Sequence, residues 1–373
     1  MNAGRICLIT TVHPAFDIRI FHKEAVSLAK AGYEVTLIAS DGGSGIRDGV
    51  RLVSMPKAGN RFARMTLGAS RAFFSSLKTK AQVVHFQDPE LIPVGLALRM
   101  AGIKVIYDVH EDVPKAISSK HYIPRWIRAA LSFFMLLLEK MASPFFSAII
   151  AATPAIAERF RFHHRMVIVC NYPLSGEIHE STVNSRSDSM ICAGVISENR
   201  GALVMLEAIR KLNERRKTTL ILAGKFSPDS LRPAMERHPG WKHVEYAGFL
   251  DRPELAGALM RSSAGLVILD PEERFRVALP TKMFEYMAAG IPVIASDFPL
   301  WRRIITEAGC GILVDPANPD AIADAMETVL SNPMEALEMG KRGREAFLSR
   351  YNWTTQEGIL LELYRDLFAR VNM

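Results

Sequence analysis

Short apolar runs alternate with stretches of helical pattern along the first half of the chain. The helical patterns include residues 20–31 and 89–101. Continuous apolar strands separated by helices are typical of a parallel sheet that helices cover on both faces. The pattern predicts strands at residues 5–11, 34–39, 51–55, 83–87, 104–108, 147–151 and 167–170.

The alternation stops in the middle of the chain and then starts again. Residues 171–189 are polar, rich in turn-forming residues and without periodicity, which predicts a linker. From residue 320 onward the pattern is helical almost throughout. The second half has predicted strands at residues 190–193, 219–223, 243–247, 265–269, 292–295 and 311–314.

The chain has 373 residues, which is too long for one hydrophobic core. We therefore predict an α/β protein with two doubly wound domains in series. Ligands of such sheets bind outside the carboxyl ends of the strands, so functional residues are sought directly after strands, in a cleft where two sets of strand ends face each other. The predicted parts are a first domain at 1–172, a linker at 173–189, a second domain at 190–354 and a last helix at 355–373.

Composition is that of an ordinary folded protein, with 49% hydrophobic and 23% charged residues. The longest apolar stretch, residues 129–138, is about half the length that spans a bilayer, and no secretory signal is recognised. A cytoplasmic protein, soluble or peripheral to a membrane, is expected.

Four scattered cysteines without a CxxC pair argue against a disulfide frame or a zinc site: Cys7, Cys170, Cys192 and Cys310.

Positive charge is concentrated in the first half of the chain. Residues 1–172 contain 22 Lys and Arg against 12 Asp and Glu, whereas the remainder has 24 against 27. Segments 61–80 and 121–140 are both basic and apolar, which favours binding to an anionic membrane interface. The alternative is that each segment is an ordinary helix packed on the sheet. Nucleic acid is disfavoured as a partner because no recognition motif is present.

The stretch "ALPTKMFEYMAAGIPVIASD" (residues 278–297) predicts a short helix that ends at Ala-Ala-Gly and runs into an apolar strand. Pro280 suits the first helical position, which leaves the amides of Thr281, Lys282 and Met283 without partners in the helix. Free amides, the helix dipole and the Lys282 charge together form a site for phosphate. Glu285, one turn further on, is placed to bind the two hydroxyls of a ribose. The alternative is a solvated amphipathic helix without a ligand.

Two further residues follow predicted strands. Arg200 lies in "GVISENRGALVMLEAI", a strand-to-helix loop where a guanidinium can hold a phosphate by two parallel bonds. This loop has neither GxGxxG nor GxxxxGK[ST], so it is neither a dinucleotide nor a Walker loop. His110 follows the strand at 104–108 in "YDVHED" and is a candidate catalytic residue. The alternative is a structural histidine held by a neighbouring carboxylate, and His85 is expected to be a supporting residue.

These motifs resemble a known family. "GVISENRGALVMLEAI", "YAGFLDRPEL" and "ALPTKMFEYMAAGIPVIASD" resemble the donor-binding half of the large retaining glycosyltransferase family 4. "PAFDIRIFHKEAVSLAKAGYEVTLIAS", "HFQDPELIPVG" and "VIYDVHEDVPKAI" resemble its branch that builds bacterial surface polysaccharides and lipid-linked oligosaccharides. The resemblance implies the GT-B fold, with a nucleotide-sugar donor on the second domain, an acceptor on the first, and a last helix (residues 355–371) that returns to the first domain.

The resemblance also implies roles for individual residues. His110 corresponds to the family histidine beside the donor sugar, Lys282 and Thr281 to the phosphate site, and Glu285 to the second acid of a Glu-x7-Glu signature. The first acid of that signature is replaced here by Val277, and Val195 stands where many members have a second basic residue. The implied donor-binding residues are Gly194, Arg200, Phe249, Thr281, Lys282 and Glu285. The acceptor-side candidates are Asp17, Arg19, His22, Lys23 and Asp112.

The reaction implied by the resemblance is front-face transfer with retention, in which the leaving diphosphate takes the acceptor proton. No Asp-x-Asp motif is present, so no metal and no cofactor are expected, and Arg200, Lys282 and the helix dipole would neutralise the diphosphate. The expected acceptor is a saccharide or a polyprenyl-diphosphate-linked sugar. Alternatives are a non-catalytic nucleotide-sugar-binding subunit, suggested by Val277, and a GT-B epimerase or phosphorylase.

Overall fold

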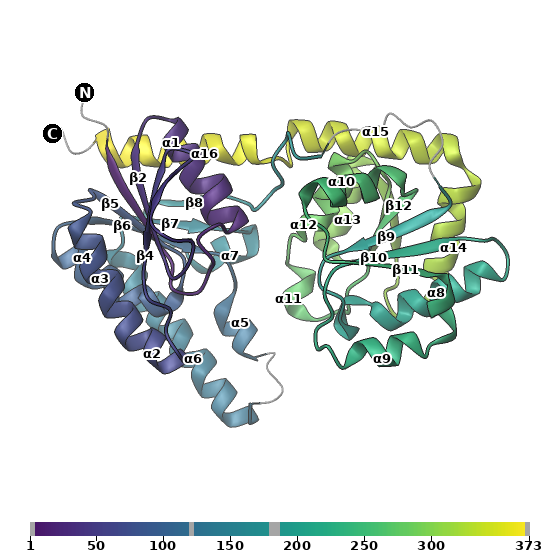
Figure 1. Ribbon diagram of the computed structural model, residues 1–373, viewed down its shortest axis with the longest axis horizontal. Coiled ribbons are helices and arrows are strands. Elements are labelled where there is room, and N and C mark those ends of the chain that lie inside the picture. The colour runs from purple at the N-terminus through teal and green to yellow at the C-terminus, as the bar shows by residue number, and fades with distance from the viewer. Residues whose placement is uncertain (1–3, 119–122, 179–186, 370–373) are drawn as a thin grey trace. The chain divides into compact units, whose positions relative to one another are not determined.

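The structure is a computed structural model that describes residues 4–118, 123–178 and 187–369 (Figure 1). Its contacts divide the chain into two compact units. Unit 1 comprises Met1–Asn171 and Gln356–Met373, and unit 2 comprises Tyr172–Thr355. The segment at 173–189 that the sequence predicts as a linker is grouped with unit 2, and its residues 179–186 fall outside the described residues.

Unit 1 is built on an eight-stranded sheet with the order β3-β4-β2-β1-β5-β6-β7-β8. All neighbouring strands are parallel except β3, which is antiparallel to β4. Aromatic rings fill the core beside the central strands, where Phe86 stacks on Tyr107 at 5.0 Å between centroids. The strands are β1 (Arg5–Ile9), β2 (Glu34–Ala39), β3 (Gly45–Arg47), β4 (Val50–Ser54), β5 (Val83–Phe86), β6 (Lys104–Val109), β7 (Ala148–Ala151) and β8 (Met166–Ile168).

Helical segments connect these strands. Asp17 starts the first of them, because its carboxylate accepts hydrogen bonds from the amides of Arg19 and Ile20. The helical segments are η1 (Ile18–Ala25), α1 (Val26–Lys30), α2 (Arg61–Ala63), η2 (Arg64–Gly68), α3 (Ala69–Lys78), η3 (Pro89–Leu91), α4 (Ile92–Met100), α5 (Val113–Ser118), α6 (Arg125–Ala142), η4 (Ser143–Phe145) and α7 (Pro154–Arg159).

Unit 2 is built on a six-stranded, fully parallel sheet with the order β11-β10-β9-β12-β13-β14. Its strands are β9 (Ser189–Ala193), β10 (Thr219–Ala223), β11 (Val244–Gly248), β12 (Ala264–Val267), β13 (Val293–Ser296) and β14 (Gly311–Val314). Its helices are η5 (Glu198–Arg200), α8 (Ala202–Asn213), α9 (Leu231–Glu236), η6 (Pro239–His243), α10 (Arg252–Arg261), α11 (Glu273–Arg276), α12 (Thr281–Ala288), α13 (Pro299–Ala308), α14 (Pro319–Ser331) and α15 (Pro333–Ser349). The predicted α/β class with two doubly wound domains is confirmed.

The last helix, α16 (Trp353–Ala369), belongs to unit 1 from Gln356 onward. The Gln356 side chain accepts a hydrogen bond from the Cys170 amide, and the Tyr364 hydroxyl contacts Nδ1 of His85 at 2.9 Å. The prediction that the last helix returns to the first domain is therefore confirmed. The predicted end of this helix, at residues 370 and 371, lies outside the described residues.

The structure corrects several predicted boundaries. The first strand ends at Ile9, not at Thr11, because the hydroxyl of Thr10 and the amide of Thr11 bond to Asp88 instead of continuing the strand. Strand β3 was not predicted, since it has only three residues and all of them are exposed. The predicted strands 167–170 and 265–269 lie one residue earlier at their start and end two residues earlier, as β8 and β12.

Candidate functional site

The helix α12 begins in unit 2 after strand β12, where the sequence predicts a phosphate site. Pro280 is the residue before the helix, not its first residue, as its ψ of 120° shows. The amide of Met283 donates to the Pro280 carbonyl at 3.0 Å, so the prediction that Met283 offers a free amide is wrong. The amides of Thr281 and Lys282 have no acceptor within the described residues. These two amides at the positive end of the helix dipole can bind an anion.

Close packing fixes the position of this helix. The side chain of Tyr286, a residue of α12, is fully buried. Its hydroxyl accepts a hydrogen bond of 3.0 Å from the Ala193 amide at the end of β9. A Cβ on Gly265 of β12 would come within 2.2 Å of the Tyr286 ring, so only glycine permits this approach. The start of α12 is consequently held beside the carboxyl end of β9.

The Lys282 side chain turns inward. It is 8% exposed, and its Nζ lies 3.6 Å from Sγ of Cys192 in β9. All four cysteines are free and buried. Among the described residues no carboxylate pairs with Lys282, so its ammonium charge is available to a ligand at the end of β9.

Arg200 lies at the end of η5, in the loop that follows β9. Its guanidinium carbon is 5.6 Å from the centroid of Phe275, and that of Arg274 is 4.5 Å from the same ring. Partial burial, and next the neighbouring charge of Arg274, lower the pKa of Arg200. Within the described part of the chain Arg200 has no carboxylate partner. Two cations beside one ring, one of them unpaired, favour an anion between them.

Glycines lie in the loop on both sides of Arg200. Gly201, with φ of 72°, begins α8, and a Cβ there would come within 2.8 Å of the Ile268 carbonyl oxygen at the end of β12. Gly194, with φ of 106°, has open space where a Cβ would stand.

At the end of β11, Phe249 is 71% exposed, and Nζ of Lys225 lies 5.3 Å from its ring centroid. Phe249 therefore presents a free aromatic face.

Glu285 is 7% exposed and belongs to an ion-pair chain that the sequence did not reveal. One of its oxygens accepts a bond of 2.6 Å from Arg252, whose other terminal nitrogen pairs with Glu177. Burial would lower the pKa of Arg252, but Glu285 and Glu177 raise it. Arg252 thus orients Glu285 and leaves its second oxygen for a ligand. Arg252 lies in the motif "YAGFLDRPEL", but nothing in that motif indicates that Glu285 is its partner.

The first acid of the family signature has no substitute in the described structure. Val277 ends α11 and is partly buried, and its side chain has no hydrogen-bonding group. The nearby Glu272 accepts bonds from Asn199 at 3.0 Å and from Arg274 at 2.7 Å. Glu272 therefore holds the Arg200 loop against the loop after β12.

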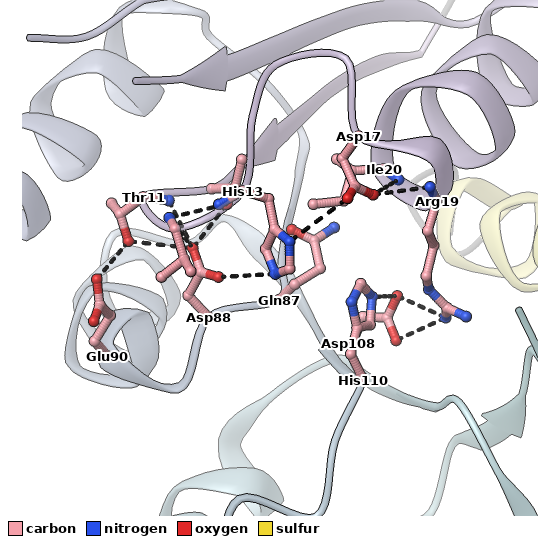
Figure 2. Close-up of polar contacts among 12 residues, drawn as sticks. Thr11, His13, Asp17, Arg19, Ile20, Gln87, Asp88, Glu90, Asp108 and His110 are labelled. Carbon is pink, nitrogen blue, oxygen red and sulfur yellow. Dashed lines mark hydrogen bonds and ion pairs between the residues drawn. The ribbon is translucent and has the colours of Figure 1, made fainter. Parts of the chain in front are cut away.

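In unit 1 the loop after β1 is anchored to the end of β5 (Figure 2). Oδ2 of Asp88 accepts bonds from the Thr11 amide at 2.6 Å and the Thr10 hydroxyl at 2.9 Å. His13 lies between Asp17 and Asp88, with ring nitrogens 3.6 and 3.7 Å from their oxygens. Asp17 raises the pKa of His13, burial opposes this, and Asp88 adds to the rise. His13 was not predicted as a site residue, although it too lies in a loop that follows a strand.

His110 follows β6 and is held by a buried carboxylate. Its Nε2 lies 2.9 Å from Oδ2 of Asp108, and its side chain is 17% exposed. The pKa of His110 is lowered: burial is the largest cause, Asp108 opposes it, and Arg19 adds to the lowering. A neutral His110 that donates through Nε2 keeps a lone pair on Nδ1, which has no protein partner in the described structure. Asp108 therefore fixes the ring, as the structural reading expects, and Nδ1 has no protein partner among the described residues; the catalytic role of His110 stays a prediction.

The lowered pKa predicts how activity depends on pH. We expect turnover to be constant above pH 7 and to fall as the pH drops through the His110 pKa, below 6.5, because protonation removes the Nδ1 lone pair. A pH profile of initial rates tests this. His13→Asn should keep the acid limb and His110→Gln should lose it. An acid limb with a midpoint above 6.5 would show that His110 does not act as the neutral ring.

The acceptor-side candidates differ in what they contact. Arg19 is buried, with Nη2 3.0 Å from both oxygens of Asp108 and Nε 2.8 Å from Glu24. Lys23 is also buried, and its Nζ donates to the side-chain oxygen of Asn171 at 2.6 Å. These two cations stabilise the interior of unit 1, and only Arg19 borders the cavity described below.

The remaining candidates are separated from one another. His22 is exposed and packs edge-on against the Phe21 ring. Asp112 accepts a bond of 3.1 Å from Arg159. Asp17, besides capping η1, borders a cavity of about 520 Å³ that His13, Gln87, Asp88, His110 and Glu111 also line. The structure thus brings Asp17 and His110 together and leaves His22 and Asp112 outside this cavity.

One group of side chains has the spacing of metal ligands. Ligand atoms of Glu24, Asp108 and His110 lie within 4.8 Å of one another. The guanidinium of Arg19 contacts both carboxylates, so a positive charge already occupies the position that a cation would take. The residues present therefore do not fit a metal ion.

Comparisons with known proteins agree with these features. Residues 19–171 match the family model "Glycosyltransferase Family 4", and residues 177–346 match "Glycosyl transferases group 1". A GDP-mannose:cellobiosyl-diphosphopolyprenol alpha-mannosyltransferase of Xanthomonas oryzae is 27% identical over 48% of this chain and 47% of its own. A phosphatidyl-myo-inositol mannosyltransferase of Mycobacterium tuberculosis is 28% identical over 45% and 44%. The chain spans about half the length of the curated relatives it matches.

Solved structures show the same fold at low identity. Sucrose-phosphate synthase from Thermosynechococcus elongatus has a TM-score of 0.78 at 18% identity, covering 99% of this chain and 100% of that one. Anabaena HepE in complex with UDP-glucose has a TM-score of 0.74 at 13% identity, covering 97% and 99%. Together the family models span both units and the neighbours share the two-domain architecture. The chain therefore belongs to glycosyltransferase family 4 and has the GT-B fold.

Proposed function

We propose that the protein transfers a sugar from a nucleotide-diphosphate-sugar donor to a saccharide or lipid-linked acceptor in surface polysaccharide assembly. The observation that carries this proposal is the start of α12. There two free amides, the unpaired buried Lys282 and the oriented carboxylate of Glu285 follow one another within five residues. Amides and an ammonium suit a diphosphate, and the carboxylate suits a ribose diol. Phe249 offers a surface on which a nucleobase can stack.

In the proposed reaction the cations of unit 2 act on the leaving group. Charge grows on the diphosphate as the bond to the sugar breaks, and Arg200, Lys282 and the α12 dipole stabilise it. The acceptor hydroxyl attacks the same face of the sugar, its proton passes to the diphosphate oxygen, and the anomeric configuration is retained. These groups would do the work of a divalent ion, so we propose a metal-independent reaction without cofactors. Nδ1 of His110 is proposed to accept a hydrogen bond from a sugar hydroxyl.

The names of the relatives suggest which substrates to test first. One is named for GDP-mannose and a diphosphopolyprenol-linked disaccharide, and the other for mannosyl transfer to a phosphatidyl-inositol. Both named acceptors carry a lipid. We therefore propose GDP-mannose as the first donor to examine and a lipid-linked sugar as the first acceptor.

Incubation with a panel of nucleotide sugars, with and without membrane lipid extract, tests the proposed activity. The expected result is release of nucleoside diphosphate that depends on the extract, with label from the sugar recovered in the lipid. Binding without turnover would favour a non-catalytic subunit, as Val277 suggests. Conversion without an acceptor would favour an epimerase.

We also propose that unit 1 binds an anionic membrane surface. Of the 25 large apolar side chains exposed among the described residues, 14 lie between Phe62 and Phe145. On α6 they include Trp126 at 75% and Phe133 at 66% exposure, so the outward side of this helix is apolar. Helix α4 packs against both α3 and α6, which makes the three helices neighbours (Figure 1). No helix in the described ranges has the length and apolarity needed to cross a bilayer.

The charges on these helices complement anionic lipid. Segment 61–80 has five basic and no acidic residues, and the one acid in segment 121–140, Glu139, is buried against Tyr107. His121 and Tyr122 of that segment lie outside the described residues. Apolar side chains that insert and basic side chains that meet lipid headgroups together produce interfacial binding.

Exposed basic residues should therefore control vesicle binding. Replacing Arg61, Arg71, Arg125 and Lys140 by Gln should weaken binding to vesicles with anionic lipid by about 100-fold or more, since each contributes about 1 kcal/mol at low salt. Sedimentation measures this. The matched control replaces four exposed basic residues of unit 2, Lys217, Arg237, Lys242 and Arg303, and should bind normally. Equal binding to neutral vesicles, or none to either kind, would contradict the proposal.

A further inference from the structure

The cavity of unit 1 has an unusual balance of hydrogen-bonding atoms. It lies at the carboxyl ends of β1, β5 and β6 and has a volume of about 520 Å³. Three of its lining residues carry carboxylates: Asp17, Asp88 and Glu111. Burial alone would raise the pKa of Asp17, but hydrogen bonds from His13 and from the Ile20 and Arg19 amides lower it to about 2.

Gln87 adds an unsatisfied acceptor to this cavity. Its side chain is buried, at 3% exposure, and points toward the space between His13 and Asp17 (Figure 2). Its amide nitrogen lies 3.4 Å from a Glu24 oxygen, whereas Oε1 is buried without any hydrogen-bond partner among the described residues. A buried oxygen without a hydrogen-bond partner is destabilising, and a hydroxyl donor from a ligand would satisfy it.

The cavity's cations are already paired. Arg19 is bonded to Asp108 and Glu24, and His13 lies between Asp17 and Asp88. The charged groups left for a ligand are therefore carboxylates. Oε1 of Gln87 adds a neutral acceptor, and the amide nitrogen of Asn171, whose oxygen accepts from Lys23, adds a donor.

We propose that this cavity binds a neutral, hydroxyl-rich sugar ring at the reacting end of the acceptor, and that Gln87 and Glu111 make it reject uronic acids and phosphorylated sugars. Hydroxyl groups donate to the acceptor atoms, whereas a carboxylate or phosphate would be placed against like charges without a free cation. The inference rests on the proposed function and names the class of acceptor for it. Any phosphate of a lipid-linked acceptor must then bind outside this cavity.

Ligand-detected NMR on the full-length protein tests the inference without requiring turnover. The probes are methyl glycosides of neutral hexoses, 6-deoxyhexoses and N-acetylhexosamines, methyl glucuronide and glucose 6-phosphate, with GDP or UDP present. We expect at least one neutral glycoside to bind at least 10-fold more tightly than either acidic probe. Gln87→Met should weaken neutral binding about 10-fold. Glu111→Lys, on an exposed loop, should bring the acidic probes within about threefold of the neutral one.

Glu158→Lys is the matched control, because Glu158 on α7 is 76% exposed and does not line the cavity. It should keep the wild-type preference. Acidic probes that bind as tightly as neutral ones to the wild type, or no neutral probe binding at all, would overturn the inference. So would unchanged selectivity in both Glu111→Lys and Gln87→Met. Transfer from a nucleotide sugar is measured separately, so its loss would count against the proposed function instead.

Discussion

Replacing Lys282 by methionine is expected to lower turnover at saturating donor by about 100-fold or more while weakening donor binding by less than about 10-fold. The ammonium is buried beside the end of β9 and has no carboxylate partner in the described structure. Its charge is therefore available to the leaving diphosphate, whose negative charge is larger in the transition state than in the bound donor. Methionine is an unbranched side chain of nearly the same length, and it removes the charge together with the N–H donors. Steady-state kinetics with varied donor separates the two effects.

Arg200→Met should also lower turnover more than it weakens donor binding, since Arg200 is the other cation of this site without a carboxylate partner among the described residues. Lys211→Met serves as the control: Lys211 lies on α8 and pairs with Asp320 at 2.6 Å, away from the start of α12. Its turnover should equal that of the wild type. Undiminished turnover in both Lys282→Met and Arg200→Met would refute the role of these cations in stabilising the leaving group.

Replacing Glu285 by glutamine is expected to weaken binding of nucleoside diphosphate and intact donor alike, by about 10- to 100-fold. A hydrogen bond to a charged acceptor contributes about 1.5–3 kcal/mol, and each 1.4 kcal/mol corresponds to a factor of ten. The ribose is present in both ligands, so both affinities should fall together. Isothermal titration calorimetry gives these affinities directly.

Glu177→Gln is the control for the ion-pair chain. It removes the other partner of Arg252 but leaves the Glu285 carboxylate in place. We expect its effect to be several-fold smaller than that of Glu285→Gln. Equal losses in the two variants would mean that Glu285 acts only by holding Arg252, and unchanged affinity in Glu285→Gln would remove it from the donor site.

The architecture was predictable because its signals are local. Apolar runs such as 34–39, 219–223 and 311–314 coincide with β2, β10 and β14 to the residue, since most of their residues are apolar and nearly all are at least partly buried. The edge strand β3 was not predicted, because its residues are exposed and need not be apolar. Arg200 was a candidate because its loop follows the buried strand β9, and the start of the helix at Thr281 was indicated by Pro280 before a helical pattern.

The partners of these residues were not predictable in the same way. Glu285 and Arg252 are 33 positions apart, and Arg19 meets Asp108 across 89 positions. No spacing rule connects such pairs; only the folded sheet brings them together. Arg19 looked like a cation for the acceptor, but it is committed to buried carboxylates. Gln87 was not predicted, because a single amide side chain forms no recognisable sequence motif. Only its buried Oε1, which has no hydrogen-bond partner among the described residues, distinguishes it.

The crystal structure of the protein with the nucleoside diphosphate of its donor tests the central claim most directly. The account predicts diphosphate oxygens within hydrogen-bonding distance of the Thr281 and Lys282 amides and of Nζ of Lys282, and ribose hydroxyls on the free oxygen of Glu285. A diphosphate bound elsewhere, with the start of α12 left empty, would contradict the account.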